Sequence, residues 1–188
     1  AISEAQRCLF CNDICNICVG VCPNFANLSF ETNKFNIPIY SIDIGDAINY
    51  SIVDYLNIEQ TNQIINIGDF CNECGNCNTF CPTNGAPYLT KPKFYLTLES
   101  FDSEDNCFYL SGDLIKYKSN NKIESVIMFE DNLVYESEDI KVILNKNNFE
   151  IISIDTQKKI QNKLLKKAAE MIFLFTSLKD NSIFKQFN

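Results

Sequence analysis

Short apolar segments separated by turn-forming residues run along most of the chain. In the first half, residues 27–31 and 63–67 have the length and composition of strands, and the second of these leads into a run of cysteines. Residues 46–56 instead repeat their apolar positions at helical spacing. We therefore expect a helix there, with Asp46 as its cap.

The second half of the chain predicts a strand-rich region that ends in a long helix. Asp131 and Asn132 lie between two apolar segments and predict a hairpin turn. After Thr156 the apolar residues recur with the period of a helix, which we expect to extend to Leu178. The expected strands cover residues 94–98, 107–110, 126–129, 133–135 and 142–144.

Composition favours a soluble, acidic protein. Hydrophobic residues make up 46% of the 188 residues and charged residues 21%, and no run approaches the roughly 18 apolar residues of a membrane span. The net charge of −8 argues against binding nucleic acid through phosphates. Because residues 1–7 lack the features of a secretory signal, we expect a cytoplasmic protein with neither a nucleic-acid nor a membrane partner.

Cysteines carry the chemical signal, since nine of the ten fall in two runs. The second run has the spacing C-x2-C-x2-C-x3-C-P, by which bacterial ferredoxins hold four-iron clusters. It consists of Cys71, Cys74, Cys77 and Cys81. The first run also ends in x3-Cys-Pro and consists of Cys8, Cys11, Cys15, Cys18 and Cys22. Thiolates are soft ligands that suit iron and sulfide, so the two runs predict two [4Fe-4S] clusters.

The cysteine before each proline is expected to serve the cluster of the other run, as it does in two-cluster ferredoxins. Cys22 would then complete the cluster held by Cys71, Cys74 and Cys77. Cys81 would complete the cluster of the first run. This exchange of ligands would tie the two halves of the module together.

The first run has one cysteine too many for its cluster. Reading backward from Cys22, the intervals favour Cys11, Cys15 and Cys18 as the three ligands. Cys8 is an alternative ligand, because Cys8-x2-Cys11 is itself a good pair and could be joined by either of the other two. Spacing alone leaves this choice open.

Two other interpretations of this cysteine-rich chain are possible. Zinc also binds four thiolates and would make the chain a metal-stabilised interaction module without redox chemistry. A free-standing ferredoxin subunit is the other rival. The chain has no histidine, no Gly-x-Gly-x-x-Gly and no phosphate loop, so we predict no catalytic residue and no flavin or nicotinamide site of its own.

Several segments carry a resemblance to known oxidoreductases. Residues 4–11 resemble the Glu-Ala-x-Arg-Cys-Leu-x-Cys signature of proteins related to the glutamate synthase small subunit. Residues 15–24, 69–77 and 85–88 resemble the carboxy-terminal iron–sulfur region of the family called "putative selenate reductase subunit". In that family the region follows a flavin- and nicotinamide-binding unit. The resemblance therefore implies that FAD and NAD(P) bind a partner domain or subunit, namely a flavin-containing reductase.

These observations combine into an α+β chain that transfers electrons. Residues 1–90 are expected to form a ferredoxin-like module with two [4Fe-4S] clusters. Residues 91–188 are expected to form a small β-rich domain closed by the carboxy-terminal helix. The chain would act as the electron-transfer region of an NAD(P)H-dependent oxidoreductase, whose redox acceptor the sequence does not identify.

Overall fold

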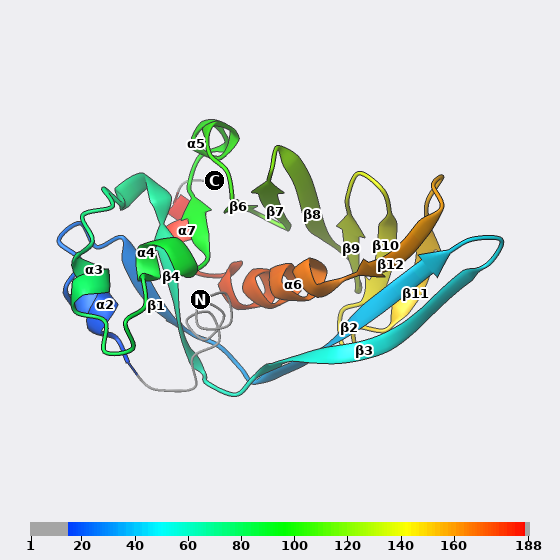
Figure 1. The fold of residues 1–188 in the computed structure, drawn as a ribbon, viewed down its shortest axis with the longest axis horizontal. Helices are drawn as coiled ribbons and strands as arrows, with labels where there is room; N and C mark the ends of the chain where they lie inside the picture. The colour runs from blue at the N-terminus through cyan, green and yellow to red at the C-terminus, as the bar shows by residue number, and fades with distance from the viewer. Residues whose placement is uncertain (1–14, 187–188) are drawn as a thin grey trace. The chain divides into compact units, whose positions relative to one another are not determined.

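The computed structural model describes residues 15–186, which form two compact units (Figure 1). Unit 1 comprises residues 15–34 and 58–109, and unit 2 comprises residues 35–57 and 110–186. The domain boundary expected near residue 90 lies inside unit 1. The chain leaves unit 1 after residue 34, because the segment that follows pairs with a strand near the carboxy terminus, and it returns at residue 58.

Unit 1 contains mixed strands joined in the order β1-β4-β5-β6. β1 and β4 are antiparallel, whereas β4, β5 and β6 run parallel to one another. Parallel neighbours cannot be joined by a tight hairpin, so each connection crosses over. The crossover from β4 to β5 contains the whole second cysteine run. The strands are β1 (Asn27–Glu31), β4 (Asn62–Ile67), β5 (Lys93–Tyr95) and β6 (Cys107–Ser111).

The helical elements of unit 1 are all short. They are α2 (Ile17–Gly20), η1 (Gly68–Phe70), α3 (Asn76–Thr79), α4 (Pro87–Thr90) and α5 (Leu98–Ser103). Helices of one or two turns are not stable alone in water, so these depend on packing and on their connections. Two such packing contacts join α2 to α3 and α3 to α4.

Unit 2 contains an antiparallel meander and a separate three-stranded sheet. The meander consists of β7 (Leu114–Ser119), β8 (Lys122–Phe129), β9 (Asn132–Glu136), β10 (Lys141–Asn145) and β11 (Ile151–Asp155). The smaller sheet has the order β12-β2-β3 and consists of β2 (Phe35–Ile44), β3 (Ile48–Ile58) and β12 (Ile160–Leu164). The helices are α6 (Lys166–Leu178) and α7 (Ser182–Gln186).

Helix α6 forms the centre of the unit 2 core. It contacts β2, β7 and β8, and Figure 1 shows it running alongside the meander. Nine of its thirteen residues are buried, and the ring of Phe173 meets that of Phe35 edge-on at 5.6 Å. Each large apolar side chain buried in this way stabilises the fold by about 1.5–3 kcal/mol. Within residues 15–186, no helix is both long and apolar enough to cross a membrane.

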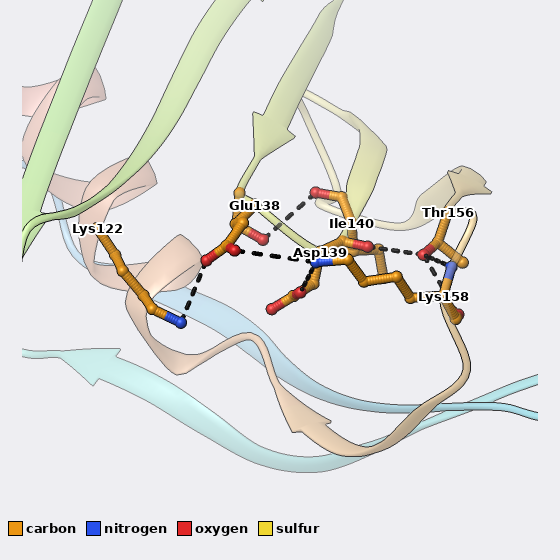
Figure 2. A network of polar contacts seen from close by, with 7 residues as sticks. Lys122, Glu138, Asp139, Ile140, Thr156 and Lys158 are labelled. Carbon is orange, nitrogen blue, oxygen red and sulfur yellow. Dashed lines mark hydrogen bonds and ion pairs between the residues drawn. The ribbon is translucent and has the colours of Figure 1, made fainter.

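The polar interactions of unit 2 include a network of ion pairs at its surface (Figure 2). The Lys158 ammonium group lies 2.7 Å from a carboxylate oxygen of Asp139 and 4.0 Å from one of Glu138. Glu138 also pairs with Lys122 at 3.1 Å. The Thr156 hydroxyl donates to the Asp139 carbonyl oxygen at 2.6 Å, which fastens the chain after β11 to the loop before β10.

Several predicted elements are confirmed and two are wrong. Strands are found at 27–31 and over 63–67, as expected, and the expected segments within 107–145 also lie in strands. The predicted helix over 46–56 is wrong, because these residues form β3, the partner of β2. Its Ile, Val and Tyr residues favour strands, and pairing with the preceding strand β2 prevails over the helical spacing. Asp46 therefore caps no helix.

The predicted long helix begins ten residues later than expected. Residues 160–164 form β12, and α6 starts at Lys166. Ile160 pairs with Ile44, while Asn162 adopts φ 50° and donates its N–H to the Asp43 carboxylate at 2.8 Å. These contacts with β2 hold the segment extended.

Two smaller corrections concern turns. The hairpin between β8 and β9 exists, but Phe129 pairs with Asn132, so the turn residues are Glu130 and Asp131, one position earlier than predicted. Glu130 takes the left-handed conformation that such a turn requires, with φ 54°. The strand expected over 94–98 ends at residue 95, because Leu98 begins α5.

Candidate metal centre

Two cysteine segments in unit 1 share one backbone design. We call residues 15–26 the first segment and residues 74–85 the second segment. Each position in the second lies 59 residues after its counterpart in the first, including three cysteines and the proline. Each segment forms a four-residue helix, α2 or α3, with a cysteine at its second position. The sequence spacing that marks the two runs thus corresponds to repeated local structure.

Both segments end in a turn that directs a backbone N–H at a cysteine sulfur. The Ala26 N–H donates to Cys22 Sγ at 3.2 Å, and the Gly85 N–H donates to Cys81 Sγ at the same distance. Cys81 Sγ also lies 3.3 Å from the Thr83 hydroxyl oxygen. Hydrogen bonds of this kind favour thiolate over thiol and are among the protein's means of tuning bound metal.

The two turns also share a left-handed backbone conformation. Phe25 and Asn84 occupy equivalent positions and have φ values of 55° and 54°. The left-handed region suits asparagine but is unusual for a bulky residue such as phenylalanine. Strained residues of this kind are maintained where the surrounding structure and function require them. In each turn this left-handed residue comes directly before the residue whose N–H reaches the sulfur.

Cysteines from both runs line a single cavity. Cys15 and Cys18 of the first segment and Cys81 of the second face a cavity of about 230 Å³. The ligand exchange predicted from the spacing requires Cys81 to lie beside first-run cysteines, and this cavity has that property. The rest of its lining comes from Asn62, Gln63, Ile64, Pro82, Thr83, Pro87 and Lys91.

Cys18 and Cys77, the equivalent cysteines of α2 and α3, are buried in one small core. Both pack around Ile64 on β4, with exposed fractions of 7% and 6%. Burial raises the pKa of Cys18 to about 11, an effect that the nearby Lys91 charge opposes. The thiol form of Cys18 is therefore strongly favoured in the absence of a bound cation.

For Cys81, the effects that lower the pKa outweigh the effect of burial. Burial acts to raise its pKa, but hydrogen bonding with Thr83 and Gly85, followed by the charge of Lys91, holds the pKa of Cys81 below its usual value. Thiolate is the form that ligates metal. The cavity therefore combines one cysteine that ionises more readily than an ordinary cysteine with one whose ionisation is opposed by burial.

A buried pair of asparagines supports the first segment from β1 and β4. The Asn27 amide donates to the Cys18 carbonyl oxygen, and the Asn66 amide donates to Asn27 Oδ1, both at 2.9 Å. Both side chains are almost fully buried. Within the described residues, Asn66 Oδ1 has no hydrogen-bond partner. An amide oxygen buried without a partner carries an energetic cost.

The remaining second-run cysteines lie outside this cavity. Cys71 is half-buried just after η1, and Cys74 is exposed. The approach to Cys71 is fixed by Gly68, where a Cβ atom would come within 2.4 Å of the Tyr95 ring. The next residue, Asp69, accepts a hydrogen bond from the Leu96 N–H at 2.7 Å. These two contacts fasten η1 to the region around β5.

Three further cysteines need separate statements. Cys8 and Cys11 lie outside the described residues. Cys107 is fully buried against Tyr95 and Phe101, in a cluster distinct from the cavity. Among residues 15–186, no three His, Cys, Asp or Glu side chains converge closely enough to hold a single metal ion. A four-iron cluster binds each thiolate to a different iron, so its ligands are spaced more widely than those of one ion.

Sequence reasoning missed Lys91 and the two buried asparagines. Lys91 follows the last turn of α4 and precedes a proline, a position at which a lysine is ordinarily exposed. Asn66 had a weak signal, since it interrupts the apolar residues of β4. Neither residue could be connected with the cysteines without knowing how β1, β4 and α4 pack.

Comparison with known proteins links the chain to an oxidoreductase. It is 34% identical over 120 residues to "Putative oxidoreductase YgfK" of Escherichia coli strain K12, and equally so to the protein of the same name from E. coli O157:H7. The match covers 63% of this chain and 9% of each relative. No family model and no solved structure matches. The chain is thus related in sequence to a small part of a protein named as an oxidoreductase.

Proposed function

We propose that this chain transfers electrons through two [4Fe-4S] clusters held by exchanged ligands, in a ferredoxin-like module. The observation that carries the proposal is the shared cavity, in which Cys81 of the second run faces Cys15 and Cys18 of the first. Separate zinc sites, one for each run, would not need this juxtaposition. The ligand exchange of two-cluster ferredoxins does need it.

The residues around the cavity suit one such cluster. Cys81 would hold it together with Cys11, Cys15 and Cys18. In the alternative, Cys8 and Cys11 would be joined by one of Cys15 and Cys18. The soft thiol donors match iron and sulfide, and the backbone N–H group directed at Cys81 is of the kind that stabilises bound thiolate. The cavity is built from both segments, so binding there would also hold α2 and α3 together.

The second cluster would use the other second-run cysteines. Cys71, Cys74 and Cys77 would hold it together with Cys22, whose sulfur accepts the Ala26 N–H. Exposure of Cys74 gives this side access to a redox partner, while burial of Cys77 shields the opposite side from water.

A bound [4Fe-4S] cluster supplies one-electron chemistry at potentials that its surroundings set. The chain's own residues supply those surroundings. Burial of Cys18 and Cys77 lowers the local polarity, and the N–H groups of Ala26 and Gly85 offset negative charge on the sulfurs they reach.

The partner in this proposal is a flavin-containing reductase domain or subunit. The chain spans less than a tenth of the length of the relatives it matches, which leaves room for FAD and NAD(P) sites elsewhere in such proteins. NAD(P)H-dependent reduction fits a cytoplasmic location. The motif resemblance makes selenate the first acceptor to test with the assembled enzyme.

Reductive titration of the anaerobic protein tests this function. We expect a brown protein that bleaches on addition of dithionite and accepts about two electrons per chain, one for each cluster. Cys107→Ala is the matched control, because Cys107 lies away from the cavity and its variant should accept the same number of electrons. A colourless protein that contains zinc and accepts no electrons, even after iron and sulfide reconstitution, would contradict the proposal.

A further inference from the structure

Lys91 is a buried cation within the cysteine-lined cavity. Its exposed fraction is 7%, and it lines the cavity with Cys15, Cys18 and Cys81. The backbone fixes its position, because its N–H donates to the Pro87 carbonyl oxygen at 2.9 Å at the end of α4. None of the ion pairs between described residues involves Lys91.

Little of Lys91 is exposed, although within the described residues its Nζ is not among the fully buried polar atoms that lack a partner. A lysine with so little exposed surface is usually paired with an opposite charge. Neutral thiols do not provide that charge, whereas an assembly of thiolates, sulfide and iron carries net negative charge. The position of Lys91 therefore points to an anionic group in the cavity, of the same chemistry that the cysteines predict.

The cation near the other cysteines is arranged differently. Lys93 forms an ion pair with Glu73 at 3.0 Å, next to Cys74. A paired lysine contributes little net field, because the carboxylate cancels most of its charge. The two sides of the module therefore differ in uncompensated positive charge, and Lys91 is the source of the difference.

We propose that Lys91 is the counter-charge of the cluster held by Cys81 and the first-run cysteines, and that it raises the reduction potential of that cluster selectively. This inference rests on the proposed function. Reduction adds one negative charge to a cluster, and a nearby fixed cation stabilises the reduced form more than the oxidised form. Among the described residues, the cation next to Cys74 is the paired Lys93, so the cluster on that side should respond little.

Potentiometric titration of Lys91→Met, followed by visible absorption and EPR, tests the inference. At a fixed potential, the ratio of reduced to oxidised protein should fall about tenfold for one cluster, which is a shift of about 59 mV for a one-electron couple. Lys91→Arg keeps the charge and should leave the ratio close to that of the unmodified protein. The matched control is Lys34→Met, which removes an exposed lysine paired with Glu59 in the same unit.

The outcomes separate this inference from the function on which it rests. Lys91→Met protein with full iron content and unchanged potentials overturns the inference alone, as does an equal shift of both clusters. An unmodified protein that takes up no iron and sulfide overturns both proposals. If Lys91→Met purifies with reduced iron content, Lys91→Gln provides the same comparison with a polar side chain, and the same shift in one cluster is expected.

Discussion

Unit 1 and unit 2 differ in what they bury. Of the five polar or charged residues buried in the described part of the chain, four lie in unit 1: Asn27, Gln63, Asn66 and Lys91. Unit 2 contributes Glu170, whose carboxylate pairs with Lys167 on the same helix. The other side-chain ion pairs of unit 2 lie at its surface, including the network in Figure 2.

This difference indicates where stability has been given up for a site. Burying a polar group is costly unless it is hydrogen-bonded. In unit 1 the buried polar groups surround the cysteines, since Gln63 and Lys91 line the cavity and Asn27 binds the Cys18 carbonyl group. Unit 2 is instead organised around an apolar helix. We infer that unit 1 depends on the group it binds, whereas unit 2 does not.

Of the changes considered, removal of iron should produce the largest difference in stability between the two units. Ligands that bind only the folded state stabilise it by about 2.7 kcal/mol or more when they are present at a hundredfold excess over the dissociation constant. After anaerobic chelation we expect backbone amides of unit 1 to lose at least about a hundredfold of their protection against hydrogen exchange. Amides of α6 and β7–β10 should keep theirs. Equal loss in both units would refute the comparison.

Substitution of Cys81 should remove one cluster. Cys81→Ala takes away the second-run thiol that faces Cys15 and Cys18, so we expect roughly half of the bound iron and sulfide to be lost. Elemental analysis of the anaerobically purified variant measures this directly. Cys107→Ala serves as the control and should retain the full content. Unchanged iron in the Cys81 variant would mean that the cavity is not a cluster site.

The asparagine pair offers a smaller perturbation of unit 1. Asn27→Ala leaves the Cys18 carbonyl group and the Asn66 amide without their partners, and should lower the free energy of unfolding by about 1–3 kcal/mol. Urea unfolding of the iron-loaded protein, followed by cluster absorption, measures the change. Asn33→Ala is the matched control, because Asn33 is an exposed asparagine of unit 1 that does not line the cavity. A similar loss in both variants would argue against a special role for the buried pair.

The smallest effect is expected at the surface of unit 2. A hydrogen bond from Lys158 holds the pKa of Asp139 below its usual value. Because the folded-state pKa lies below the unfolded one, the stabilisation is present above the unfolded pKa and disappears as the pH falls through the folded pKa. Asp139→Asn should therefore cost at most about 0.2–1 kcal/mol near neutral pH and nothing in strong acid.

Urea unfolding of unit 2 at neutral and acidic pH tests this prediction, with hydrogen exchange of the meander as the probe. Asp155→Asn, which removes an exposed acidic group on β11, is the control. Iron content should be unchanged in both variants. A loss of cluster in Asp139→Asn would contradict the separation between the two units.

The spacing of residues in the sequence predicted those elements that short stretches of chain determine by themselves. The strands at 27–31 and 63–67 followed from short apolar segments, and the cysteine spacing identified two segments that share a helix and a turn. The site residues that the sequence indicated were all cysteines. Their partners were not marked by any pattern, because Lys91 and Asn66 reach the site only through packing of distant elements.

Elements decided by strand pairing were the ones that sequence reasoning misassigned. Residues 48–56 and 160–164 both have apolar positions compatible with a helix, yet both form strands beside β2, the first next to it in the chain and the second far from it. The hydrogen bonds of a sheet come from another part of the chain, so a short window cannot register them. The same reasoning explains why a boundary near residue 90 was expected, although residues 35–57 belong to unit 2.

The most direct test of the central claim is the content of iron, acid-labile sulfide and zinc in the anaerobically prepared protein. The account predicts about eight irons and eight sulfides per chain, as two [4Fe-4S] clusters require, with no stoichiometric zinc. Zinc bound at one or two ions per chain without sulfide, and no uptake of iron and sulfide on reconstitution, would contradict it.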